Sequence, residues 1–150
     1  HPEHVGVGFG VSALVGLSIH SFFDGISIAS GVVISPGLGL LLFVAILLHK
    51  APEGFTIASI MLAGGHSRAT AQLSSIAVGA AAILGAVAVY PLHSFVGEGL
   101  ALSAGVTLYV AASDLIPEVN RSEDGRVAVM VFVGVVLYYA TESFIEAIGL

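Results

Sequence analysis

Charged residues are scarce in this sequence of 150 residues. They make up 9% of the chain, against about 25% in a typical soluble domain, while 57% of the residues are hydrophobic. This balance excludes an ordinary soluble domain and is typical of a membrane protein. Only four residues are Lys or Arg and the net charge is −6, so nucleic-acid binding is excluded as well. Cysteine is absent, which excludes disulfides, thiolate metal ligands and cysteine nucleophiles.

Long hydrophobic runs fill the space between the few polar stretches. They cover about residues 5–34, 38–64, 69–90, 100–116 and 127–148. Each run is near or above the roughly 20 residues that a helix needs to cross a bilayer. The alternating polarity of transmembrane β-strands is absent from these runs. The sequence therefore predicts an all-α fold, a polytopic transmembrane helix bundle with five spans in a single domain.

The basic residues outside these spans predict an orientation. Arg68 lies between the second and third spans, and Arg121 and Arg126 lie between the fourth and fifth. Because the loops alternate between the two sides of the membrane, all three arginines fall on one side. The positive-inside rule then places the N-terminus in the cytoplasm and the C-terminus outside.

Two neighbouring spans carry the same polar motif. The first contains HSFFDGISIAS from His20, and the second contains HKAPEGFTIAS from His49. The two stretches align without gaps and share the pattern H-x-x-x-[DE]-G-x-[ST]-I-A-S. Chance could produce one such stretch, but two in adjacent spans indicate an internal repeat.

The spacing inside the motif favours a metal site. Residues i and i+4 lie one turn apart on the same helix face, so each span presents one imidazole and one carboxylate together. The short turn around Ser35 and Pro36 makes the two spans antiparallel neighbours. The candidate ligands are His20, Asp24, His49 and Glu53. Two nitrogen and two oxygen donors suit Zn²⁺ or Fe²⁺ better than Ca²⁺ or Mg²⁺. The alternative is that the carboxylates form structural hydrogen bonds or pair with Lys50 and the histidines.

These motifs resemble those of the ZIP (ZRT/IRT-like) metal transporters. HSFFDG and HKAPEG are similar to the motifs of that family's fourth and fifth transmembrane helices, and residues 108–118 resemble its seventh. The resemblance implies that the five spans are helices four to eight of an eight-helix fold. The first three helices would then be further parts of the same protein. It also implies an extracellular C-terminus, in agreement with the arginines.

The resemblance also implies roles for individual residues. His20, Asp24, His49 and Glu53 match the family's primary metal ligands. Many members hold a second metal beside the first, using the residue that follows each motif histidine and a carboxylate of the next helix. Here those positions are Ser21 and Lys50, and residues 69–90 contain no acid. We therefore expect a single metal, with the Lys50 ammonium in place of the second ion.

The expected function is transport of divalent transition-metal ions toward the cytoplasm by alternating access at a mid-membrane site. Zinc is the first expectation, with iron, manganese and cadmium as alternatives. The cell membrane is the expected location, and the oligomeric state, for which a homodimer is one alternative, stays open. A channel, an intramembrane metalloenzyme and a proton relay are the competing functions. An enzyme is disfavoured because catalytic zinc keeps three protein ligands and the H-E-x-x-H pattern is absent.

Several other residues have weaker claims. Pro52 is expected to kink the second span. Asp114 is a candidate for the route by which the ion leaves. The candidates for a polar path are Ser27, Ser30, Thr56 and Ser59, and the candidates for attracting cations are His93, Glu98, Glu142 and Glu146. The histidines expected on the cytoplasmic surface are His1, His4 and His66.

Overall fold

The computed structural model describes residues 7–121 and 125–149, and all regular structure among them is helical. The helices are α1 (Val7–Ile34), α2 (Pro36–Ala63), α3 (Arg68–Val89), α4 (Val96–Val110), α5 (Ile116–Arg121) and α6 (Gly125–Ala147). Two short helices flank α4, namely η1 (His93–Phe95) before it and the π-helical η2 (Ala111–Leu115) after it. Five stretches of the described residues are long and apolar enough to cross a membrane, which confirms the all-α multi-pass class.

A capped turn makes α1 and α2 antiparallel neighbours. Ser35 alone separates the two helices, with an extended backbone, and its Oγ accepts a hydrogen bond from the Leu38 N–H at 3.2 Å. Pro36 occupies the first position of α2, where its missing N–H leaves no helical bond unmade. Because the connection is so short, residues at equal distances from the turn lie at similar depth in the two helices.

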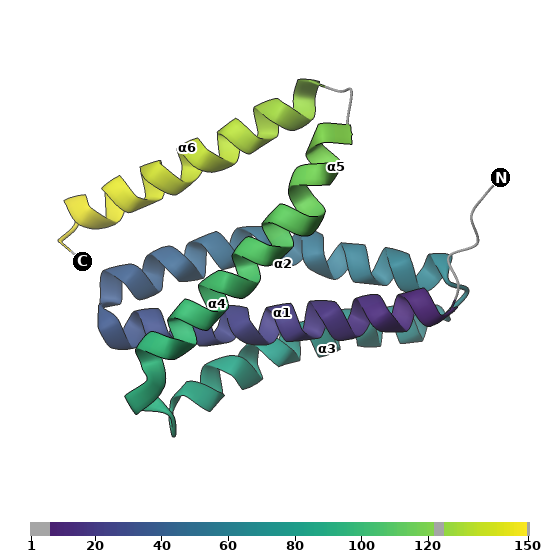
Figure 1. Ribbon diagram of the computed structural model, residues 1–150, viewed down its shortest axis with the longest axis horizontal. Helices are drawn as coiled ribbons and strands as arrows, with labels where there is room; N and C mark the ends of the chain where they lie inside the picture. The colour runs from purple at the N-terminus through teal and green to yellow at the C-terminus, as the bar shows by residue number, and fades with distance from the viewer. Residues whose placement is uncertain (1–6, 122–124, 150) are drawn as a thin grey trace.

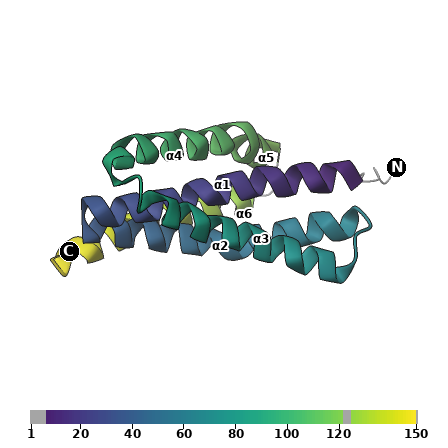
Figure 2. The same cartoon turned by 90° about the horizontal axis from the view of Figure 1, so that it is seen from below.

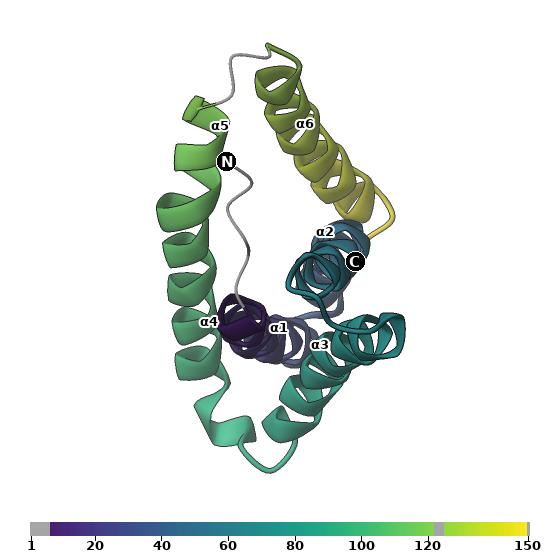
Figure 3. The ribbon, with the colours of Figure 1, turned by 90° about the vertical axis from the view of Figure 1, so that its right-hand side faces the viewer.

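The backbones of α1 and α3 approach each other closely, and α1 packs more extensively on α3 than on any other helix. A Cβ added at Gly25 would overlap the Ala82 carbonyl oxygen, and one added at Gly85 would overlap the Phe22 carbonyl oxygen. Only glycine permits this separation, which is the usual way in which membrane helices gain packing contacts. Figures 1 and 3 show α1, α2 and α3 bundled together.

A small apolar core fills the α1–α3 bundle toward the end where α2 joins α3. Its buried residues are Ile57, Met61, Ala71 and Val78. Ala13, Leu14 and Leu17 of α1 pack against them. Toward the opposite end, the buried side chains of α1 are polar, and they form the site described below.

The helices α4 and α6 make fewer contacts with this bundle. Figure 2 shows α4 and α5 along one side of α1, and Figure 3 shows α6 beside α2. Ser103 of α4 joins α1 by hydrogen bonds to Ser27 (2.5 Å) and to the Phe23 carbonyl (2.6 Å). Among the described residues of α6, only Ile145 is buried. These two helices therefore leave most of their apolar surface for lipid or for further protein.

The fourth membrane-crossing stretch is longer than the hydrophobic run about residues 100–116. It spans His93–Ser113, and the helical backbone continues through η2 into α5, which ends at Arg121. In η2, the Ile116 N–H bonds to the Ala111 carbonyl, five residues back. Pro117, which has no N–H to donate, follows directly after this π-helical turn. Part of the polar stretch 117–126 is consequently helical.

Candidate metal centre

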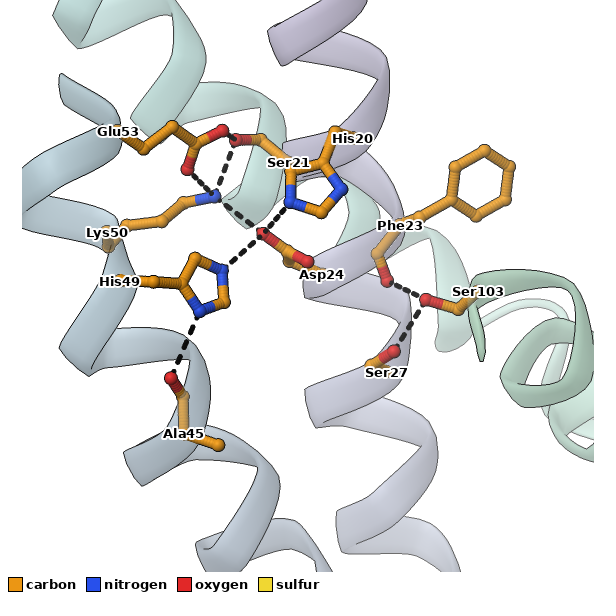
Figure 4. A network of polar contacts seen from close by, with 10 residues as sticks. All are labelled: His20, Ser21, Phe23, Asp24, Ser27, Ala45, His49, Lys50, Glu53 and Ser103. Atoms are coloured by element: carbon orange, nitrogen blue, oxygen red, sulfur yellow. Dashed lines mark hydrogen bonds and ion pairs between the residues drawn. The ribbon is translucent and has the colours of Figure 1, made fainter. Parts of the chain in front are cut away.

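His20, Asp24 and His49 bring three ligand atoms together between α1 and α2. Figure 4 shows both imidazoles directed at the same carboxylate. Nε2 of His20 lies 3.7 Å from Oδ2 of Asp24, and Nε2 of His49 lies 3.5 Å from the same oxygen. In a tetrahedral site with bonds of about 2.0–2.1 Å, neighbouring donor atoms are about 3.3 Å apart. These two separations are therefore close to those that one zinc-sized ion requires.

Each of the three side chains is positioned by its helix. His20 and Asp24 are one turn apart on α1, as the i,i+4 spacing predicts. The His49 ring is oriented by a hydrogen bond between its Nδ1 and the Ala45 carbonyl at 3.1 Å. Since a carbonyl oxygen only accepts, Nδ1 carries the proton in this contact, which leaves Nε2, 3.5 Å from Oδ2 of Asp24, as the nitrogen available to a metal. An imidazole held in this way by its second nitrogen is typical of metal ligands.

The three side chains differ in exposure. Asp24 is 3% exposed and His20 is 16% exposed, whereas His49 is 45% exposed. His49 lines a hollow of about 440 Å³ between α2 and α6, together with Pro52, Tyr138 and Thr141. The site is therefore closed on its α1 side and open at His49.

Lys50 occupies the space between the two motif carboxylates. Its Nζ lies 2.8 Å from Oδ2 of Asp24, 2.6 Å from Oε2 of Glu53 and 2.5 Å from Oγ of Ser21. Ser21 in turn donates to Oε1 of Glu53 at 2.9 Å. Ser21, Asp24 and Glu53 are all buried. The ammonium is thus surrounded by oxygen atoms at the distances of strong hydrogen bonds.

Glu53 lies beside the three ligand atoms but not among them. The group of residues whose ligand atoms all lie within 4.8 Å of one another comprises His20, Asp24 and His49 within the described part of the chain. Glu53 is directed at Lys50 and Ser21 instead (Figure 4). Of the four ligands expected from the sequence, the structure thus gathers three and places the fourth on the far side of the ammonium.

The remaining candidates are dispersed. Ser27 and Ser30 are buried in α1, with Ser30 Oγ lacking a hydrogen-bond partner among the described residues, whereas Thr56 and Ser59 are exposed. The exposed candidates also include His93, Glu98 and Glu146. His66 follows the end of α2, where its ring lies close to Gly10 of α1. Asp114 belongs to η2, and the structure describes its backbone but not its side chain. His1 and His4 lie outside the described residues.

The bend expected at Pro52 is present in α2. Figure 1 shows α2 changing direction part-way along its length, and Pro52 within this helix cannot donate to the Leu48 carbonyl.

Ser103 carries the inter-helix hydrogen bonds of α4 but belongs to no motif of the sequence. A lone serine in an apolar run is a weak signal, and its partners become apparent only when α4 is placed against α1.

Comparison with known proteins identifies a family for this chain. Residues 6–142 match the family described as ZIP zinc transporter. The chain belongs to the ZIP family. Members of this family are transporters and not enzymes, which removes the metalloenzyme alternative.

Several curated relatives are about 30% identical to the chain. Zinc transporter ZIP9-B of Xenopus laevis is 31% identical over 122 residues, which cover 73% of this chain and 40% of the relative. Zinc transporter ZIP9 of Macaca fascicularis is 31% identical over 118 residues, which cover 71% of this chain and 50% of the relative. Zinc transporter ZIP13 of Rattus norvegicus is 29% identical over 117 residues, which cover 74% of this chain and 32% of the relative. The matched part of this ZIP chain thus spans half or less of these relatives, and no solved structure matches it.

Proposed function

We propose that this ZIP chain forms the metal-binding part of a transporter for divalent transition-metal ions, with zinc as the main substrate. The single observation that carries the proposal is the convergence of His20, Asp24 and His49, from two membrane-crossing helices, on one point. An ionisable cluster within hydrocarbon costs several kcal/mol per charge and needs a function or a partner to offset it. A divalent cation among these donors supplies that compensation.

The donors support selection of the ion. Two imidazole nitrogens and a carboxylate suit zinc, and iron, manganese and cadmium are the alternatives with overlapping preferences. We propose one ion per chain. A second cation beside the first would have to share the place of the Lys50 ammonium, which already pairs with both Asp24 and Glu53.

The proposed mechanism is alternating access at the depth of this site. His49 is the exposed member of the cluster and faces the hollow between α2 and α6, which supports a route for the ion on that side. Uptake would proceed toward the cytoplasm, with the N-terminus inside as the arginines indicate. We further propose that the cell membrane holds the protein and that preceding helices of the same protein complete the path.

The proposal is tested by metal binding and transport of the full-length protein. Alanine at His49 is expected to weaken zinc binding at least tenfold and to abolish zinc uptake into proteoliposomes. Alanine at His93, an exposed histidine of η1, is the matched control and should change neither quantity. Equal effects of the two substitutions would contradict the site. Proton conduction by metal-free proteoliposomes would indicate a relay instead of a carrier.

A further inference from the structure

The two copies of the repeated motif have different surroundings. In α1, Ser27 and Ser30 are buried, whereas the matching Thr56 and Ser59 of α2 are exposed. The two copies align without gaps, and the helices that carry them are antiparallel. A twofold rotation about an axis in the membrane plane therefore relates one copy to the other. Each surface that α1 buries against another helix consequently has a matching surface on α2.

The α1 copy is covered by a hydroxyl group of α4 (Figure 4). Ser103 donates its one hydroxyl hydrogen to the Phe23 carbonyl at 2.6 Å, so Ser27 is the donor in its 2.5 Å contact with Ser103. The hydroxyl of α4 thus lies between Ser27 and the carbonyl four residues before it. Gly99, one turn from Ser103, permits this approach, because an added Cβ would lie 3.2 Å from Cγ2 of Ile26.

The α2 copy has the same groups in a different arrangement. Pro52 matches Phe23, and its carbonyl accepts a hydrogen bond directly from Thr56 at 2.8 Å. Serine and threonine make this bond to the carbonyl four residues back when they use their own helix as the acceptor. Phe55, which matches Ile26, is 74% exposed. Thr56 therefore keeps its hydroxyl hydrogen on α2, whereas the matching serine of α1 donates to a neighbouring helix.

The glycine of the motif differs between the copies in the same sense. A Cβ added at Gly25 would overlap the Ala82 carbonyl oxygen of α3, but one added at Gly54 would meet no described atom within 4 Å. Gly54 borders a hollow of about 510 Å³ between α2 and α3. Glycine inside a helix costs about 1 kcal/mol relative to alanine, and close packing of a further helix offsets that cost.

We propose that the α2 face carrying Phe55, Thr56 and Ser59 binds a helix from the preceding part of the same protein. That helix presents a serine or threonine hydroxyl, which accepts from Thr56 and donates to the Pro52 carbonyl, with glycine or alanine one turn away. The curated relatives are at least twice as long as the matched residues, so they contain enough chain for such a helix. This inference rests on the proposal that preceding helices complete the path.

The two junctions lie beside the motif carboxylates. Phe23 directly precedes Asp24, and Pro52 directly precedes Glu53. A hydroxyl from a neighbouring helix then contacts each of the two turns that carry these carboxylates. The contact on α1 comes from α4, and the contact on α2 comes from the docked helix.

Photochemical cross-linking of the full-length protein in lipid vesicles identifies what covers this face. Phe55 is replaced by p-benzoylphenylalanine, a photoreactive residue of similar shape, and peptide mass spectrometry locates the partner after illumination. We expect a cross-link to a segment that precedes His1, close to a serine or threonine with glycine or alanine four residues away. Cross-links only to lipid, to a second copy of the chain or to another helix of the described chain would overturn the proposal.

The matched control is the same replacement at Phe132 of α6. Phe132 is 73% exposed, like Phe55, but belongs to no copy of the motif. It should not label the segment that Phe55 labels. Equal labelling of that segment from both positions would mean that capture is not specific to the α2 face, and the proposal would be dropped.

The hydroxyl of Thr56 gives a second measurement that needs no photoreactive residue. Thr56→Val keeps the shape and removes the hydroxyl, and with a docked helix it should lower the thermal midpoint of the full-length protein by about 3 °C. Thr56→Ser keeps the hydroxyl and should restore most of this loss. Thr141→Val is the control, because Thr141 makes the same bond to its own helix, at 2.8 Å from the Leu137 carbonyl. Equally small shifts in Thr56→Val and Thr141→Val would show that Thr56 serves only its own helix.

Failure of this inference is distinguishable from failure of the proposed function. If the metal site is wrong, zinc binding will be absent or insensitive to alanine at His49, while the cross-link from position 55 still forms. If the docking face is wrong, the cross-link will go elsewhere, while zinc binding still depends on His49.

Discussion

The α1–α3 bundle and the pair α4 and α6 are built on different principles. In the bundle, glycines bring backbones into direct contact, and a buried core and a buried polar cluster lie between the helices. By contrast, α4 is joined to α1 by serine hydrogen bonds, and the one buried residue among the described part of α6 is Ile145. All three residues of the proposed metal site belong to the bundle.

The contrast shows where this chain requires fixed geometry. Three ligand atoms on two helices must keep their separations within a few tenths of an ångström, and close backbone packing restricts the movements that would alter them. The helices α4 and α6 carry no residue of the cluster and expose most of their large apolar side chains. Because those surfaces suit lipid or other helices, we expect α4 and α6 to form the part of the protein that adapts to its surroundings.

The largest expected effect comes from breaking the contact between α1 and α3. Gly85→Ala would place a methyl group against the Phe22 carbonyl, and a backbone atom cannot move aside by changing rotamer. We expect a loss of about 3 kcal/mol in the free energy of unfolding, the upper range for overpacking. Unfolding in mixed detergent micelles measures this loss.

Gly79→Ala is the matched control for this substitution. It lies on the same helix, but an added Cβ meets nothing within 4 Å. Alanine is also the better helix former by about 1 kcal/mol, so stability should be unchanged or higher. Equal losses from both substitutions would show that the loss at Gly85 does not depend on its contact with Phe22, and the close-contact explanation would fail.

A smaller effect is expected at the hydrogen bonds that hold α4. Ser103→Ala removes the donor to the Phe23 carbonyl and the partner of Ser27. Hydrogen bonds between membrane helices contribute about 1–2 kcal/mol, so hydrogen exchange should rise in α4 while the α1–α3 bundle stays protected. Thr107→Ala, at an exposed position one turn further along α4, should leave exchange unchanged. Increased exchange throughout α1–α3 would mean that the two regions are not independent.

The smallest effect is expected on α6. Ile145→Ala removes the side chain that is 5% exposed, whereas Phe144→Ala truncates a neighbour that is 64% exposed. In a membrane the lost contacts are mainly van der Waals packing, so the first change should cost about 1 kcal/mol and the second close to nothing. Unfolding in micelles measures the loss of stability for each substitution. A larger loss from Phe144→Ala would indicate that the exposed face of α6 packs against other protein in the micelle.

Helical periodicity and the short turn between α1 and α2 made the grouping of His20, Asp24 and His49 predictable from the sequence. His20 and Asp24 meet because residues four apart share a helix face, and the short turn at Ser35 brings His49 alongside. The position of Glu53 was not predictable in this way. Its motif spacing matches that of Asp24, but the long Lys50 side chain reaches between the two carboxylates and pairs with both.

The sequence by itself determined the helical class, the five apolar stretches and the repeated His/carboxylate motif, because length, apolarity and i,i+4 spacing are properties of a single helix. Only the tertiary structure decided that Gly85 lies against the backbone of α1, that Ser103 bonds to α1, and that Lys50 separates Glu53 from the histidines. Those contacts depend on how far each helix is rotated about its axis and on side-chain rotamers, and neither is encoded in the periodicity of one segment.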